Sequence, residues 1–246
     1  MSDADTIPAS PPKPWSILAT IAWAVLAAGL SIVVSLPLVL WWLGDNADLA
    51  EGITSDGIMF AVLTCLTTPV QIAVLGLAAH LAKWRIADYL GLLWPNRREI
   101  VLALWVTVIF VLGYDGLTIL LGRDVVTPFQ IDAYYTAQQQ GGIWLLWFAF
   151  VVVAPAGEEI LFRGFLFRGW ALSAHTTWIA IVLIAGAWAG MHVQYDWFGI
   201  TQIFLIGLIF GWIRWRSGST ALTIFLHGLL NAWATLQTAV KVEWLS

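Results

Sequence analysis

The sequence predicts an all-α fold, a polytopic bundle of transmembrane helices. Two features of the composition lead to this prediction: hydrophobic residues make up 60% of the 246 residues, and charged residues only 11%. Soluble globular chains typically contain about 45–50% apolar and about 25% charged residues. The third observation is a succession of apolar runs, each long enough to cross a bilayer as a helix of about 20 residues. The chain accommodates about six to eight such helices, and the pattern favours about seven.

The N-terminal part of the chain is predicted to hold three spans. Residues 1–14 are polar, acidic and rich in proline, a composition typical of disorder, and they lack the basic segment of a secretory signal peptide. The N-terminal transmembrane helices then occupy residues 15–142. Their spans are expected at 15–43 (kinked or tilted at Pro37), 58–82 and 100–121. The third span contains Asp115, an acid within the membrane, and the polar segment 122–142 is expected to be a loop.

The C-terminal part, residues 143–240, is predicted to hold four further spans, followed by a short tail at 241–246. These spans are expected at 143–173, 176–194, 198–213 and 219–240. Pro155 should kink the first of them, because proline lacks the N–H that a helix uses at that position. We find no internal repeat and no soluble domain.

Basic residues in short loops predict the orientation, because such loops favour the cytoplasmic side. The basic residues of the loops after the second and sixth spans are Lys83, Arg85, Arg97, Arg98, Arg214 and Arg216. The acidic loop 44–57 contains no Lys or Arg. With seven spans, the two basic loops fall on one side and the acidic loop on the other. The N terminus is therefore expected in the cytoplasm and the C terminus outside.

Other features exclude whole classes of function. The formal net charge is −4, so no basic field indicates a nucleic-acid partner. Cys65 is the only cysteine, which excludes an intrachain disulfide and a cysteine-rich metal site. The chain has no His-Glu-x-x-His, Gly-x-Ser-x-Gly or phosphate-binding Gly-Lys-Ser/Thr motif.

The segment 154–164 places two adjacent glutamates and an arginine in an otherwise apolar helix. Ionisable groups inside a membrane cost at least about 2.5–3.5 kcal/mol each and usually mark a function. Glu159 and Arg163 lie four residues apart and therefore share a face, whereas Glu158 is turned about 100° away. One carboxylate can be held by the arginine while Glu158 stays free to accept a proton. An ion-paired bundle without chemistry is the alternative.

Later spans add two histidines and an amide. His192 follows Trp188 by four residues, and His227 precedes Asn231 by four. A histidine with an amide one turn away suits an oxyanion site, although interhelical hydrogen bonding explains the same pattern. Their occurrence together with the glutamate pair favours a catalytic cluster. Helix-centre estimates put His192 roughly 9 Å from the level of Glu158, so the two converge only if the fifth helix is tilted or begins deeper.

Three motifs together resemble those of the CPBP intramembrane proteases, a family that includes CaaX-processing endopeptidases and the bacterial Abi or bacteriocin-immunity proteins. The motifs are Glu158-Glu159-x-x-x-Arg163, Trp188-x-x-x-His192 and His227-x-x-x-Asn231. The resemblance covers about residues 143–238. The family usually has Phe at the position of Trp188, a difference that we expect to change only the volume of the pocket.

The resemblance implies an intramembrane endopeptidase in which Glu158 and His192 activate a water molecule. Glu159 and Arg163 would support the helix that carries the base. The substrate implied is a peptide or membrane protein in the lipid bilayer, with a prenylated C-terminal CaaX peptide as one option. The resemblance also implies the inner membrane of a bacterial or archaeal cell.

The resemblance further implies that His227 and Asn231 hold the carbonyl oxygen of the scissile peptide. Whether members of the family use a bound metal is an open question. Glu158, His192 and His227 could bind zinc with an open position, or the same groups could act without metal. We favour the metal-free, glutamate-type mechanism, because Asn231 is a poor zinc ligand and the carboxylate–histidine pair already accounts for water activation.

Two other functions remain open at this point. One is an immunity or assembly factor whose polar cluster binds a partner peptide without cutting it. The other is a small transporter in which Glu158, Asp115 and the histidines relay protons. A transporter of that kind predicts repeat symmetry and paired broken helices, and the sequence has neither.

Overall fold

The computed structural model describes residues 12–45 and 56–245, and all of their regular structure is helical. The elements are α1 (Ile17–Asp45), α2 (Gly57–Leu81), α3 (Ile86–Leu90), α4 (Arg97–Leu120), α5 (Pro128–Gln139), α6 (Ile143–Phe148), η2 (Ala149–Val153), α7 (Ala154–Glu159), η3 (Ile160–Leu166), α8 (Phe167–Trp170), α9 (Ala174–Gly190), α10 (Trp197–Ser217) and α11 (Thr220–Trp244). The two η segments are π-helical. The predicted all-α membrane bundle is confirmed.

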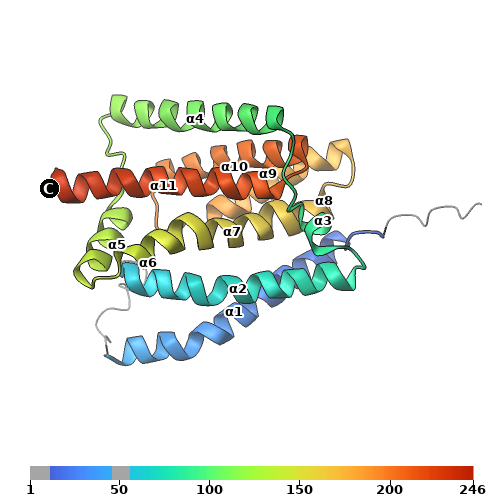
Figure 1. Ribbon diagram of the computed structural model, residues 1–246, viewed down its shortest axis with the longest axis horizontal. Helices are drawn as coiled ribbons and strands as arrows, with labels where there is room; N and C mark the ends of the chain where they lie inside the picture. The colour runs from blue at the N-terminus through green and yellow to red at the C-terminus, as the bar shows by residue number, and fades with distance from the viewer. Residues whose placement is uncertain (1–11, 46–55, 246) are drawn as a thin grey trace, which may run out of the picture.

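The long helices lie side by side along one direction (Figure 1). The segment from α6 to α8 is one continuous helix and lies between the α1–α2 pair and the group formed by α4, α9, α10 and α11. Five helices in the described part of the chain are long and apolar enough to cross a membrane: α1, α2, α4, Ile143–Trp170 and α10. The helix α9 is apolar but shorter, at 17 residues. Each expected span coincides with one helical segment, and the count of seven spans stays a prediction.

Side chains at the helix starts explain where the chain enters each element. A carboxylate, amide or hydroxyl accepts a hydrogen bond from a free backbone N–H in the first turn, which stabilises a helix start by about 1 kcal/mol. The capping residues are Asp56, Asn96, Thr127, Ser173, Asp196 and Ser219. The cap at Asp196 fixes the start of α10 directly after the turn that carries His192.

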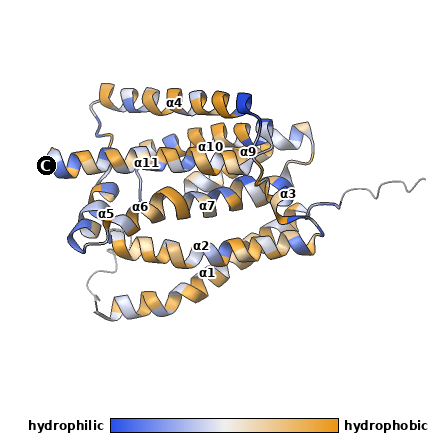
Figure 2. Ribbon diagram, in the orientation of Figure 1, coloured by the Kyte–Doolittle hydropathy of each residue, from blue (hydrophilic) through white to orange (hydrophobic). Residues whose placement is uncertain are grey.

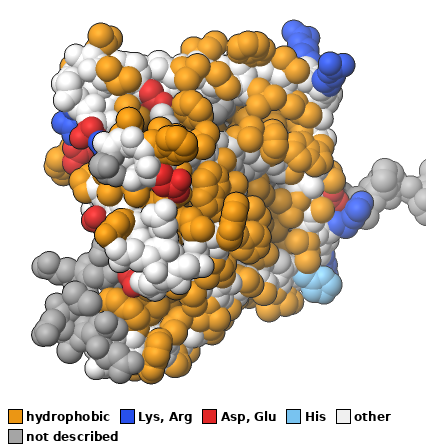
Figure 3. Space-filling model, turned by 60° about the vertical axis from the view of Figure 1, so that its left-hand side comes forward, with side chains coloured by type: hydrophobic (Ala, Val, Ile, Leu, Met, Phe, Trp, Pro, Cys, Tyr) orange, Lys and Arg blue, Asp and Glu red, His pale blue; other side chains and the backbone are white. Residues whose placement is uncertain are grey.

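Hydrophobic side chains cover the flank of the bundle, as expected for a surface that faces lipid (Figures 2 and 3). In Figure 3, Lys and Arg gather mainly along the right-hand edge, which is the end of the bundle where Figure 1 places α3. There Arg216 pairs with Glu99 at 2.8 Å, which brings the ends of α10 and α4 together. The two loops predicted to be cytoplasmic therefore lie at one end of the bundle. The orientation in the membrane remains a prediction.

Three expectations about element boundaries are wrong. Residues 122–142 do not form a simple loop, because Thr127 and Gln130 build a capping box and start α5. The fifth span does not reach residue 194, since α9 ends at Gly190. Arg214 is not in a loop but in the last turn of α10, where it is 5% exposed and donates to the backbone oxygen of Arg163 at 2.9 Å. The expected tail 1–14 and loop 44–57 fall largely outside the described residues.

Candidate active site

The glutamate-bearing helix is irregular on both sides of the glutamate pair. The π-helical segments η2 and η3 flank α7, and Pro155 lies in the first turn of α7. Proline has no N–H, so it cannot bond to a carbonyl in the preceding turn. Single-turn π segments inside α-helices are frequent at functional sites. The predicted irregularity at Pro155 therefore takes the form of a π segment within a continuous helix.

Asn231 uses one of the backbone carbonyls next to this irregularity. Its Nδ2 donates to the oxygen of Phe150, five residues before Pro155, at 2.8 Å. In a π-helix, each carbonyl oxygen accepts from the N–H five residues later. For Phe150 that residue is Pro155, which has no N–H, so the carbonyl of Phe150 has no donor within its own helix. Gly228 permits the close approach, since a Cβ there would lie 2.7 Å from the oxygen of Val151. The helix α11 is thus joined directly to the glutamate helix.

Glu159 and Arg163 form the predicted pair, fully buried. Arg163 Nη1 donates to Glu159 Oε1 at 2.8 Å, and the two side chains are 1% and 0% exposed. His227 Nδ1 lies 3.0 Å from the same oxygen. Since a carboxylate only accepts, His227 carries a proton on Nδ1 and turns Nε2 away from Glu159. Glu159 therefore orients two cationic or polar partners, as a supporting residue should.

Trp188 lies at the centre of the cluster. Its ring stacks under the Arg163 guanidinium at 4.3 Å and meets the rings of His192 and His227 edge-on, with centroids 5.4 Å and 5.3 Å away. Its Nε1 donates to Glu158 Oε2 at 2.6 Å. The expectation that Trp in place of Phe changes only the pocket volume is wrong, because a phenyl ring has no N–H to donate.

Glu158 and His192 face each other across a gap. Glu158 Oε2 lies 4.0 Å from His192 Nε2, and the side chains are 28% and 19% exposed. His192 Nδ1 lies 2.8 Å from the backbone oxygen of Trp188, which fixes the proton on Nδ1 and leaves Nε2 turned to Glu158. The expected offset of His192 disappears because α9 is short and His192 lies in the turn beyond its end.

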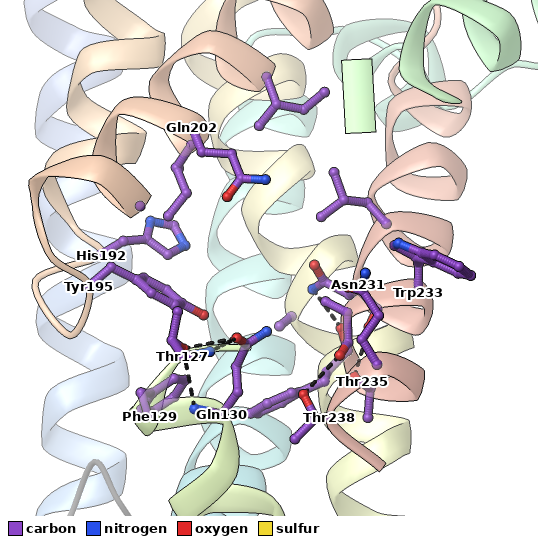
Figure 4. Close-up of a pocket in the computed structure, with 18 of the residues that line it drawn as sticks. Thr127, Phe129, Gln130, His192, Tyr195, Gln202, Asn231, Trp233, Thr235 and Thr238 are labelled. Atoms are coloured by element: carbon purple, nitrogen blue, oxygen red, sulfur yellow. Dashed lines mark hydrogen bonds between the residues drawn. The ribbon is translucent and has the colours of Figure 1, made fainter. Parts of the chain in front are cut away.

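These side chains open onto one cavity (Figure 4). His192 and Tyr195 lie on one side of it, Asn231 lies on the other, and Gln130 reaches in from α5. Burial raises the pKa of the Tyr195 phenol, and the Glu158 charge adds to that effect, so the hydroxyl remains a donor. Sequence reasoning missed Tyr195 and Gln130. The spacing of Tyr195 from His192 offered a signal, but the contribution of α5 did not show in the pattern.

Four of the six predicted site residues line this cavity: Glu158, His192, His227 and Asn231. Glu159 bonds to His227, and Arg163 lies behind it, bonded to Glu159. The zinc alternative finds less support in the geometry. Within residues 12–45 and 56–245, no three His, Cys, Asp or Glu side chains are grouped as metal ligands. Glu158, His192 and His227 therefore do not form a preassembled zinc site, and we derive no step through a metal.

Residues 140–233 match the model of a protein family described as Type II CAAX prenyl endopeptidase Rce1-like. This segment holds every predicted site residue, and the match confirms the resemblance to the CAAX proteases over it. The description of that family names an endopeptidase. An uncharacterized 24.3 kDa protein of Escherichia coli is 26% identical over 127 residues, which is 50% of this chain and 58% of that protein. No solved structure matches the chain.

Proposed function

We propose that the protein is an intramembrane endopeptidase that hydrolyses a peptide bond of a membrane-embedded or membrane-attached polypeptide without a metal. The observation that carries this proposal is the gap between Glu158 and His192. At 4.0 Å the two facing atoms are too far apart to bond directly. A water molecule at about 2.8 Å from each atom fits beside them.

The hydrogen-bonding roles of Glu158 and His192 fix the orientation of this water molecule. Glu158 is an acceptor, and His192 Nε2 is an acceptor because its proton is on Nδ1. The water therefore donates one hydrogen to each group and presents a lone pair of its oxygen to the cavity. A nucleophile oriented in this way is what general-base hydrolysis requires.

The hydrolysis then needs no group from outside the site, because Glu158 takes up one proton and later returns it. The water oxygen bonds to the carbonyl carbon while its proton moves to Glu158, and the carbonyl oxygen becomes an oxyanion. When the C–N bond breaks, Glu158 returns the proton to the leaving nitrogen. The oxyanion re-forms the C=O bond as the nitrogen leaves, which completes the hydrolysis. His192 Nε2 accepts from the second hydrogen of the water and then from the hydroxyl that the water becomes, and Trp188 keeps the carboxylate in place through the bond to its Oε2.

Side chains on α11 stabilise the oxyanion in this mechanism. Asn231 has two amide hydrogens and gives one to Phe150, so the second is free to donate to the oxyanion. A proton on His227 Nε2 would give the oxyanion a second donor, since the Nδ1 hydrogen is engaged by Glu159. Donors fixed before the reaction are worth about 2.7–4 kcal/mol each in sites of this kind.

The experiment is a comparison of protein N termini in cells that express the wild type or Glu158→Gln at matched levels. We expect N termini that occur with the wild type and vanish with Glu158→Gln. The matched control is Glu99→Gln, which alters a carboxylate outside the cavity and should retain the wild-type profile. Identical profiles for all three folded, inserted proteins would instead indicate that the cavity binds a partner peptide without cutting it.

A second measurement addresses the metal. Purified wild-type protein, treated with a chelator and then dialysed, should retain its cleavage of a substrate found in the cellular comparison. A loss of cleavage that zinc restores would replace the metal-free mechanism by one in which Glu158, His192 and His227 rearrange around the ion.

A further inference from the structure

Asp115, in the second half of α4, lines the same cavity as Glu158 and is held by two neutral donors. Trp233 Nε1 donates to its Oδ2 at 3.1 Å, and Gln237 Nε2 donates to the same oxygen at 2.8 Å. Both donors come from α11. Together they aim one oxygen of the carboxylate at α11 and leave Oδ1 without a hydrogen bond in the part of the chain that the structure describes.

The cavity supplies no cation to this carboxylate. None of the described residues that line it is Lys or Arg. A second cavity shares Trp233 and Gln237 with the first and is also lined by Arg123 and Lys241. These two cations already have carboxylate partners, since Arg123 pairs with Asp196 and Lys241 pairs with Asp124. Asp115 is therefore bonded to side chains that line both cavities.

A carboxylate in a membrane span costs free energy unless an opposite charge compensates it, and such residues usually serve a function. Neutral donors solvate it in part but do not neutralise it. We propose that the compensating charge arrives with the substrate, and that Asp115 forms a subsite for a Lys or Arg side chain of the bound peptide. This inference rests on the proposed function, because it takes the occupant of the cavity to be a peptide.

The geometry of α11 sets the distance of this subsite from the reacting bond. Trp233 and Gln237 lie six and ten residues after His227, which is roughly 9 to 15 Å along the helix. An extended peptide advances about 3.3 Å per residue. The basic residue should therefore lie about three to five residues from the scissile bond.

The negative charges of Glu158 and Asp115 disfavour a substrate that enters the cavity with its own C-terminal carboxylate. Such a carboxylate would meet Glu158 and Asp115 and no Lys or Arg among the described lining residues. The subsite therefore favours cleavage of an internal bond near a basic residue over removal of a short C-terminal peptide.

The test measures binding in a protein that cannot cut. Full-length Glu158→Gln protein in detergent micelles is titrated with a fluorescein-labelled neutral apolar peptide that carries one Lys, and with the same peptide carrying Gln or Glu instead. We expect the Lys peptide to bind about tenfold more tightly than the Gln peptide, the effect of about 1.4 kcal/mol. Asp115→Asn in the same background should abolish this difference, and Asp115→Lys should favour the Glu peptide.

Asparagine retains an oxygen that can accept from Trp233 and Gln237, so Asp115→Asn removes the charge and keeps the tie between α4 and α11. The control is Asp88→Asn, at the other end of the bundle, which should retain the Lys preference. Equal binding of all three peptides, or a Lys preference that survives Asp115→Asn, would overturn the subsite. Cleavage in cells without a Lys preference refutes the subsite alone, whereas a Lys preference without cleavage refutes only the peptidase.

Discussion

The indole N–H of Trp188 donates to Glu158 at 2.6 Å, while the face of the same ring stacks on Arg163. One side chain therefore contacts both the carboxylate proposed as the base and the cation of the supporting pair. Helix spacing pairs Arg163 with Glu159. The indole N–H of Trp188 holds the other carboxylate, that of Glu158.

Trp188→Phe should lower kcat/KM by about tenfold or more, because a hydrogen bond to a charged group contributes about 1.5–3 kcal/mol. The phenyl ring retains most of the stacking, but Trp188 is buried, so the smaller ring leaves a cavity and the thermal stability should fall as well. Cleavage of a substrate identified in cells gives the rate, and a thermal melt in detergent gives the stability.

The control for this substitution is Trp178→Phe. Trp178 packs against Trp215 on the surface, 51% exposed, and should tolerate the change without loss of rate. A rate for Trp188→Phe equal to that of the control would mean that the indole N–H plays no part in positioning Glu158.

The sequence predicted the helices well, because hydropathy reports which segments avoid water. The pairing of Glu159 with Arg163 also followed from local spacing, since residues four apart on a helix share a face. The catalytic grouping of Glu158, His192 and His227 was predicted from motif order, and the structure brings these side chains to one cavity.

The rest depends on contacts between segments far apart in the chain. No local pattern says that the Asn231 amide meets the carbonyl of Phe150, or that Trp188 donates to Glu158. The burial of Arg214 was missed for the same reason. A charged residue at the end of an apolar run is typical of a loop, and its acceptor, the backbone oxygen of Arg163, lies on another helix.

Arg163→Met should destabilise the protein by about 3–5 kcal/mol, because it leaves the Glu159 charge buried without its cation. Equilibrium unfolding in mixed micelles measures the loss. The comparison is Arg216→Met, which breaks the more exposed pair with Glu99 and should cost less than about 1 kcal/mol. Similar losses for both variants would show that Glu159 is stabilised by other groups.

Gly228→Ala should push α11 away from the glutamate helix, because its Cβ would lie 2.7 Å from the oxygen of Val151. Overpacking of this kind costs about 1–3 kcal/mol. Since His227 and Asn231 move with α11, kcat/KM should fall even under conditions in which the variant is fully folded. Gly113→Ala, where a Cβ meets nothing within 4 Å, should leave the rate unchanged and raise the stability by about 0.5–1 kcal/mol, because alanine favours a helix over glycine. An unchanged rate in Gly228→Ala would contradict the tight spacing of the two helices.

Tyr195→Phe tests whether the hydroxyl in the cavity contributes a hydrogen bond to the bound peptide. Burial raises the pKa of this phenol from its usual value near about 10, so the O–H donor is present below that value and is retained above it. The wild type should therefore exceed Tyr195→Phe by about five- to tenfold in kcat/KM, for a neutral hydrogen bond of about 1 kcal/mol or slightly more. The ratio should stay flat from about pH 6 to about pH 10, because the phenol does not ionise in that range. A ratio that falls as the pH rises would show that Tyr195 loses its proton during the assay, and a ratio of one at every pH would remove the hydroxyl from the site.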